Sequence, residues 1–73
     1  MMNLFDLEIA IRAEEANAKL LNIQDGNRQL LLGKKEWKLL PPEAKESNMY
    51  MGLPVKRSGF ESLIIVVEVE DDV

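Results

Sequence analysis

An unbroken run of five aliphatic residues, 63–67, constrains the fold of this chain more than any other feature. Its isoleucines and valines are β-branched, and such residues favour a strand over a helix. A continuous apolar run of this length is typical of a strand that is buried on both faces. After the run, Glu68 and Glu70 turn polar while Val69 stays apolar, as in a strand that ends at the surface. We therefore predict a strand over 62–69, around which the rest of the chain packs.

The N-terminal segment has the pattern of a capped helix. Asn3, followed three residues later by Asp6, is typical of a helix start, and residues 4–18 contain no glycine or proline. The spacing places two apolar stripes on nearly opposite sides of this helix, although a small domain needs only one buried stripe. One stripe holds Leu4, Leu7, Ile11 and Ala18, and the other holds Phe5, Ile9, Ala16 and Leu20. The second stripe either packs against residues 41–55, so that the helix is sandwiched, or binds a partner.

Turn residues divide the middle of the chain. Residues 19–24 are compatible with a helix or with a strand. Asp25-Gly26-Asn27 predicts a turn, because glycine and asparagine tolerate the positive φ that tight hairpin turns need. Residues 28–32 then predict a strand. A second short strand is predicted over 36–40, with a helix over 29–40 as the alternative.

Prolines and glycines continue to mark boundaries farther along. Pro41-Pro42 ends the element before it, and residues 43–47 predict one helical turn. A glycine and a proline interrupt residues 48–56, which predicts a loop or a poor edge strand. Ser58-Gly59 predicts a turn into the last strand.

Together these elements predict the α+β class, with an N-terminal helix packed on a small, mainly antiparallel sheet. Seventy-three residues make one small domain, 1–73, in which we expect residues 70–73 to form a frayed acidic tail. A single helix covers only one face of a sheet. Ile64 and Val66 lie on the face of the last strand that continues with Glu68 and Glu70, and we expect this face to be the one without a helix. These two residues would then need a dimer mate or a target.

The composition excludes several kinds of chemistry. There is no cysteine, which removes disulfides and thiolate sites, and no histidine, which removes the commonest general base. The acidic side chains are best interpreted as solvated surface groups, and the four glycines are too widely spaced for a phosphate-binding loop. We therefore predict a chain that is not an enzyme and has no catalytic residue, metal or cofactor. A small core without disulfides then points to a partner or an oligomer as a source of stability.

Charge is unevenly distributed along the chain. The net charge is −4, but residues 1–25 carry −3, residues 26–57 carry +4 and residues 58–73 carry −5. The acidic total argues against tight binding of nucleic acid, which depends on neutralising phosphates. The basic middle segment is compatible with an acidic protein partner.

Two aromatic residues lie in or near this basic segment, Trp37 and Tyr50. Single-stranded nucleic acid could stack on them, but a small domain more often uses a tryptophan as a core anchor. Together with the second helical stripe, the bases form our set of candidate partner-binding residues. The set is Phe5, Ile9, Leu20, Arg28, Lys34, Lys35, Lys38, Lys56 and Arg57.

The apolar run of five residues is too short to span a membrane, and the N-terminus lacks the pattern of a signal peptide. We therefore expect no membrane partner and a cytoplasmic location. Over its whole length, in size and general make-up, the chain resembles the small regulatory proteins that bacteriophages make to bind host enzymes. Within that group it is similar to an RNA-polymerase-binding regulator that blocks initiation and promotes antitermination. The resemblance contains no diagnostic motif, so it assigns no site residue.

The resemblance implies a target on host RNA polymerase and, for a phage protein, a location in the host bacterial cytoplasm. The function expected from the sequence is therefore that of a non-catalytic protein-binding regulator. One alternative is a homodimeric structural or antitoxin-like module that associates through Ile64 and Val66. A second alternative is a weak binder of single-stranded nucleic acid through the basic segment.

Overall fold

The computed structural model of the protein describes residues 2–69. It begins with the predicted helix, α1 (Leu4–Leu20). Asn3 and Asp6 form a capping box, in which the Asp6 N–H donates to Asn3 Oδ1 at 2.9 Å and the Asn3 N–H donates to Asp6 Oδ2 at 3.4 Å. The helix ends at Leu20, and the chain reverses at Asn22, which has φ 62°.

A short 3-10 turn, η1 (Asp25–Asn27), then leads into strand β1 (Arg28–Leu32). The turn and the strand are both confirmed. The turn does not close a hairpin, however, because it joins a helix to a strand and none of its residues has a positive φ.

The strand predicted over 36–40 is wrong, and so is a continuous helix over 29–40. The segment after β1 is a short helix, α2 (Lys34–Leu39), with Gly33 as its N-cap. Its N-terminus is fixed by backbone groups from far along the chain, which local sequence signals do not report. A second short helix, α3 (Pro42–Ser47), confirms the helical turn expected after the prolines.

Three more strands complete the sheet: β2 (Met49–Tyr50), β3 (Leu53–Arg57) and β4 (Ile64–Glu68). The strand order is β2-β3-β1-β4. β1 is antiparallel to β4 and parallel to β3, and β2 is antiparallel to β3. The α+β class is therefore confirmed, with a sheet that is mixed and has two antiparallel pairings out of three.

The central strand is β1 rather than the apolar strand near the C-terminus. β1 pairs on both sides, and its Leu30 and Leu32 are fully buried, whereas β4 lies at the edge of the sheet. The prediction that the last strand is buried on both faces is therefore wrong, since Ile65 is 36% exposed. Aliphatic residues favour a strand wherever it lies, but only its pairing decides whether it is central.

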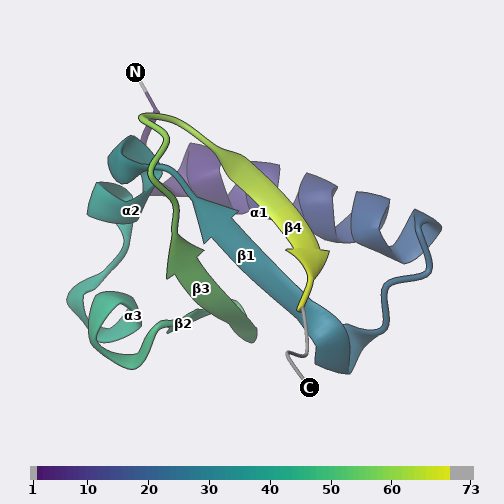
Figure 1. The fold of residues 1–73 in the computed structure, drawn as a ribbon. Helices are drawn as coiled ribbons and strands as arrows, with labels where there is room; N and C mark the ends of the chain where they lie inside the picture. The colour runs from purple at the N-terminus through teal and green to yellow at the C-terminus, as the bar shows by residue number, and fades with distance from the viewer. Residues whose placement is uncertain (1, 70–73) are drawn as a thin grey trace.

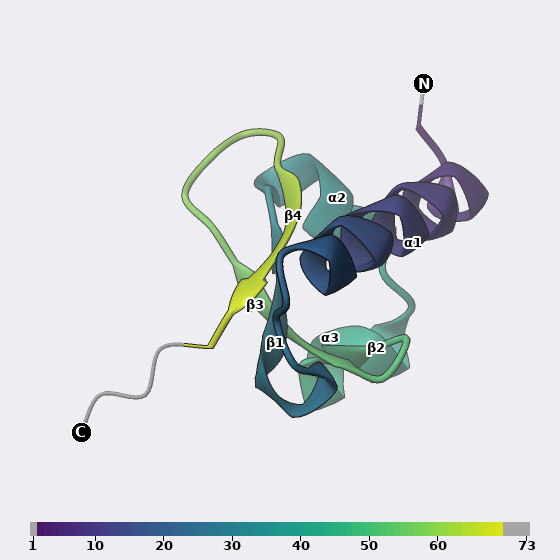
Figure 2. The same ribbon diagram turned by 90° about the vertical axis from the view of Figure 1, so that its right-hand side faces the viewer.

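The helices lie on one side of the sheet, and no helix of residues 2–69 covers the other side, which we call the uncovered face (Figure 1, Figure 2). Figure 2 views the sheet nearly edge-on, with α1, α2 and α3 on one side and the loop before β4 on the other. The core between the layers is aliphatic. It consists of Leu7, Ile11, Ala18, Leu30, Leu32, Leu40, Ala44, Leu53, Val55 and Val66.

The uncovered face carries a different set of residues from the set expected. Leu31 pairs with Ile65 on this face, and Gln29 pairs with Val67. Val66 is buried on the helix side and Ile64 is half-buried against the core, so the expected exposed pair of Ile64 and Val66 is wrong. The sequence predicted that alternate residues of the last strand face opposite sides of the sheet. Which of the two sets faces the helices depends on how β4 pairs with β1.

None of the helices among residues 2–69 is long and apolar enough to cross a membrane. The acidic tail expected at 70–73 lies outside the described residues.

Candidate protein-binding surfaces

The second apolar stripe of α1 is exposed on the outside of the molecule. We call Phe5, Ile9, Ala16 and Leu20 the outer stripe. The side chains of Phe5, Ile9 and Leu20 are 68%, 50% and 81% exposed, and Ala16 is also exposed. The inner stripe is buried, as predicted, at Leu7, Ile11 and Ala18, and Leu4 is half-buried. At 3.6 residues per turn, the two stripes point roughly 160° apart.

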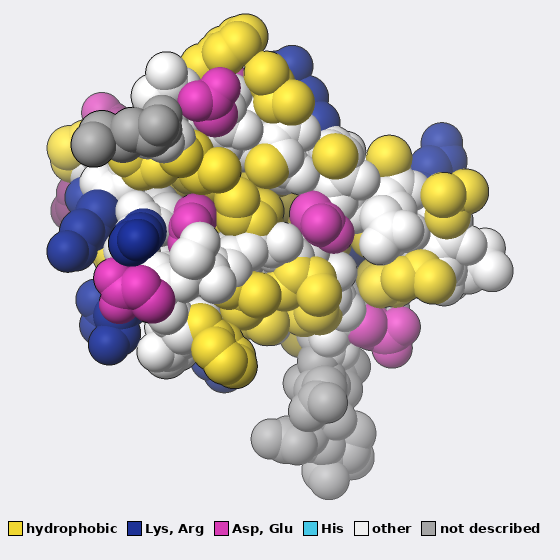
Figure 3. Space-filling view, turned by 90° about the horizontal axis from the view of Figure 1, so that it is seen from above, with side chains coloured by type: hydrophobic (Ala, Val, Ile, Leu, Met, Phe, Trp, Pro, Cys, Tyr) yellow, Lys and Arg dark blue, Asp and Glu magenta, His cyan; other side chains and the backbone are white. Residues whose placement is uncertain are grey.

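Among residues 2–69, α1 packs on one side only, so the arrangement in which residues 41–55 cover the outer stripe is excluded. Residues 42–57 form α3, β2 and β3, which lie beside and beneath the inner face of α1 (Figure 1, Figure 2). Figure 3 shows the molecule from above, with hydrophobic side chains along α1 and over the neighbouring strand. Basic side chains gather at the α2 end of this view.

Several predicted bases meet at one end of the sheet. Because β1 and β3 are parallel, their carboxyl ends lie side by side, and the residues that follow them share one edge. This brings α2, which follows β1, next to Arg57, the last residue of β3. A surface hollow of about 530 Å³ lies between them, which we call the basic hollow. It is lined by Lys34, Trp37, Lys38, Arg57, Ser58, Gly59 and Glu61.

Trp37 is half-buried and packs against the core, as expected of an anchor. The guanidinium carbon of Arg57 lies 5.9 Å from the centre of its ring, within the range of a cation–π contact. The ring is therefore partly covered by the core and by Arg57, and it still lines the basic hollow.

Tyr50 does not join Trp37 in a stacking surface. It pairs with Leu53 at the start of β3, whereas Trp37 contacts Arg57 at the end of that strand. Its hydroxyl donates a hydrogen bond of 2.6 Å to Glu8 Oε1. Burial, followed by this hydrogen bond and the charge of Glu8, raises the pKa of Tyr50 to about 12. Tyr50 thus connects β2 to α1.

A second, more apolar hollow connects the basic end to the start of α1. It has a volume of about 430 Å³. It is lined by Met2, Lys35, Glu36, Lys38, Leu39 and Ser62. Lys45 from α3 also approaches this end, since its Nζ donates to the Lys38 carbonyl at 3.1 Å.

Two of the six predicted bases lie elsewhere. Lys56 lies on the uncovered face of the sheet, where it pairs with Leu31 and lines a shallow hollow of about 620 Å³ with Gln29 and Val67. Arg28 lies at the opposite end of β1 from the basic hollow and is half-buried.

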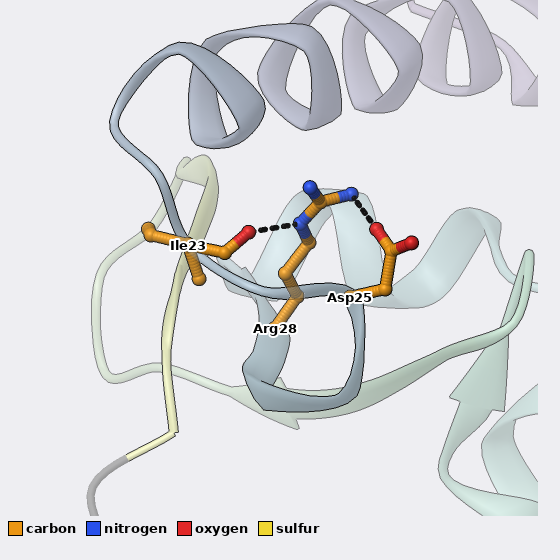
Figure 4. A network of polar contacts seen from close by, with 3 residues as sticks. All are labelled: Ile23, Asp25 and Arg28. Atoms are coloured by element: carbon orange, nitrogen blue, oxygen red, sulfur yellow. Dashed lines mark hydrogen bonds and ion pairs between the residues drawn. The ribbon is translucent and has the colours of Figure 1, made fainter.

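The contacts of Arg28 are those of a structural residue (Figure 4). Its Nε donates to the Ile23 carbonyl at 3.0 Å, and its Nη1 lies 2.6 Å from Asp25 Oδ1. Both partners belong to the connection between α1 and β1. Arg28 therefore fixes that connection and is not part of the basic surface.

Sequence reasoning missed the role of Glu36. This carboxylate is 4% exposed, and it accepts hydrogen bonds from the Ser62 hydroxyl at 2.6 Å and the Leu63 N–H at 3.0 Å. Burial by itself would raise the pKa of Glu36, but these hydrogen bonds outweigh burial and hold the pKa below its usual value of 4.5. The only sequence signal was an acid within a basic stretch, and it does not identify a partner 26 residues away.

Comparisons of the chain with protein-family models, with curated proteins and with solved structures found no match. The described part of the chain contains no group of three or more acidic side chains placed to hold a metal ion. The arrangement of residues offers surfaces for binding: an apolar stripe, a basic hollow and an uncovered sheet face.

Proposed function

We propose that this chain is a non-catalytic regulator that binds a larger protein through the outer stripe of α1. The observation that carries the proposal is the exposure of Phe5, Ile9 and Leu20 on the side of α1 that faces away from the sheet. Isolated exposed apolar residues are ordinary, but a row of them along one helix face is typical of a docking surface.

The spacing of the outer stripe supports a helix-in-groove mode of binding. Successive members are separated by four, seven and four residues, which places them on one face of the helix. From Phe5 to Leu20 the stripe is about 22 Å long at 1.5 Å per residue. Arg12 lies within the same face and is exposed, so the partner groove would tolerate or pair with a cation.

For the partner, we propose bacterial RNA polymerase. The support is the resemblance of the whole chain, in size and make-up, to phage regulators that bind this enzyme. Such a regulator acts by occupying a surface of the enzyme, which requires no chemistry of its own. The expected activity is a block of initiation, with antitermination as the related effect.

The proposal is tested with immobilised bacterial RNA polymerase and a matched pair of variants. We expect Ile9→Asp to weaken binding by about tenfold or more, because it places a charge where the partner would bury an apolar side chain. Met49→Asp is the control, since Met49 is 45% exposed, close to the 50% of Ile9, but lies on the edge strand β2. An equal loss in both variants would contradict docking through the outer stripe. No binding by the unsubstituted chain would remove RNA polymerase as the partner.

Light scattering of the free protein tests the homodimer alternative. Leu31, Ile65 and Val67 share the uncovered sheet face, so self-association would be expected there rather than through Val66. A dimer that Ile65→Lys dissociates, and that Ile9→Asp leaves intact, would replace the proposal with a homodimeric module.

A further inference from the structure

We propose that the basic hollow is a second binding site, which takes an acidic segment of a protein partner rich in Asp and Glu. The inference rests on the proposed protein-binding function and names the chemistry of one part of the partner. It concerns a surface separate from the outer stripe, so the two can fail independently.

The lining of the basic hollow carries an excess of positive charge. Lys34, Lys38 and Arg57 line the hollow, and Glu61 is its one acidic lining residue. Within residues 2–69 the one ion pair is between Arg28 and Asp25, at the other end of β1. The cations of the hollow are therefore not neutralised by ion pairs within the described fold. An anionic partner would find an excess of positive charge in a concave surface, which strengthens attraction.

The fold positions these cations from two directions. Lys34 follows β1 and has its backbone N–H fixed at 3.0 Å from the Phe60 carbonyl. Arg57 ends the parallel strand β3, and its contact with the Trp37 ring holds the guanidinium at the edge of the hollow. A cation–π contact uses none of the N–H donors of a guanidinium, so these groups can still donate to a carboxylate.

The aromatic residues near the basic hollow favour an acidic peptide over single-stranded nucleic acid. Nucleic-acid strands bind by stacking bases on free aromatic faces along a cationic groove. The Trp37 ring is half-buried, with the core against it and Arg57 over it, and Tyr50 is at the other end of β3. Phe60 is the one exposed ring beside the hollow in the described chain, which is not enough for a stacking track. The net charge of −4 also opposes a long polyanion more than a short acidic peptide.

Trp37 is the only tryptophan and lies in the hollow, so its fluorescence reports binding directly. The probe is a short capped peptide of alternating Asp and Glu, titrated at low and moderate salt, with calorimetry as a second readout. We expect a change in Trp37 emission that saturates, with an affinity that falls as salt rises.

The decisive variant reverses two charges of the hollow, Lys34→Glu with Arg57→Glu. We expect it to weaken peptide binding by about tenfold or more. The control is Arg12→Glu with Lys19→Glu, which changes the net charge equally but at exposed positions on α1, and it should retain binding. If circular dichroism shows that the double reversal is unfolded, Lys34→Gln with Lys38→Gln tests the same surface without removing the contact between Arg57 and Trp37.

Each outcome decides the proposal. Absence of peptide binding, or equal loss in the hollow and control variants, overturns it. Tighter binding of an oligothymidine of matched charge would assign the hollow to nucleic acid instead, and self-association that the peptide reverses would assign it to a second copy of this chain. Ile9→Asp should leave peptide binding unchanged, so a failure of the outer stripe as a docking surface is distinguished from a failure of the hollow.

Discussion

Helices α1 and α2 lie on the same side of the sheet, but they are stabilised by different kinds of contact (Figure 2). α1 has its own capping box and buries an apolar stripe against the sheet. α2 has no side-chain cap, and its first N–H groups, from Lys34 and Lys35, donate to the carbonyls of Phe60 and Glu61, both at 3.0 Å. A helix with its own signals forms where the sequence indicates it, whereas a helix held by a distant loop forms only when that loop is in place.

Truncation of a side chain in the buried stripe of α1 should cause the largest loss of stability. We expect Ile11→Ala to lower the free energy of unfolding by about 2–5 kcal/mol, because Ile11 is fully buried and its removal leaves a cavity. The matched change Ile9→Ala, on the outer stripe, should cost less than about 0.5 kcal/mol. Urea denaturation followed by circular dichroism measures both. Similar losses in the two variants would show that the outer stripe is covered in solution.

The dependence of α2 on its distant loop can be broken at Gly33. A Cβ at this position would lie 2.5 Å from the Leu63 backbone nitrogen and 2.7 Å from Ser62 Cα, so the backbone must shift. We expect Gly33→Ala to cost about 1–3 kcal/mol by the same urea measurement, as overpacking does. Gly59→Ala is the control, since a Cβ there has nothing within 4 Å. Equal stability of the two variants would mean that the contact of Gly33 with the loop is loose.

The stability of the contact between α2 and its distant loop should depend on pH, because this contact includes the buried carboxylate of Glu36. Glu36→Gln should lower the free energy of unfolding by about 1–2 kcal/mol at neutral pH. The two charged oxygens of Glu36 accept from Ser62 and Leu63, whereas a glutamine amide has a single, neutral acceptor oxygen. The pKa of Glu36 is lower in the folded chain than its usual value of 4.5. Its contribution is therefore complete above that value and is lost as pH falls through the lower, folded pKa.

Unfolding curves of the Glu36→Gln variant and the unsubstituted chain at a series of pH values test this prediction. The difference between them should shrink as the solution is made acidic. Glu46→Gln, at an exposed position of α3, should show no such trend. A difference for Glu36→Gln that stays constant down to strongly acidic pH would contradict a depressed pKa.

The smallest loss of stability is expected at the hydrogen bond between Glu8 of α1 and Tyr50 of β2. Tyr50→Phe removes the hydrogen bond to Glu8 and should cost about 0.5–1.5 kcal/mol. Tyr50 is the only tyrosine, so an ultraviolet absorbance titration should show its pKa raised to about 12. A raised pKa favours the protonated form in the folded state. The contribution is therefore present below pH 10, the usual tyrosine value, and is lost as pH rises toward 12.

Much of the secondary structure was predictable, and the pairing of the strands was not. Residues 4–18, 28–32 and 43–47 carry local signals, namely a cap, a preceding turn and prolines, and all three elements were confirmed. The segment 36–40 was predicted wrongly, because the contacts that make it helical come from residues 60–63. Likewise, the apolar run at 63–67 predicted a strand correctly but did not indicate that β1, with fewer β-branched residues, would be central.

The candidate surfaces were predicted in part. The sequence showed that α1 has two apolar stripes, and the structure decided that the second one is exposed and not sandwiched. The sequence named six bases, and the parallel pairing of β1 with β3 brought Lys34, Lys38 and Arg57 to one hollow. The same pairing placed Arg28 at the other end of the strand, where Asp25 neutralises it. No spacing rule in the sequence separates Arg28 from the others.

By itself, the sequence determined the α+β class, the capped first helix, the apolar last strand and a charge distribution with a basic middle. These features depend on neighbours within a few residues, where propensity, caps and side-chain periodicity act. Only the tertiary structure decided the strand order, the helical state of residues 34–39, the burial of Glu36 and the assembly of the basic hollow. Each of these depends on which distant segments meet, since hydrogen bonds and buried area between segments outweigh weak local preferences.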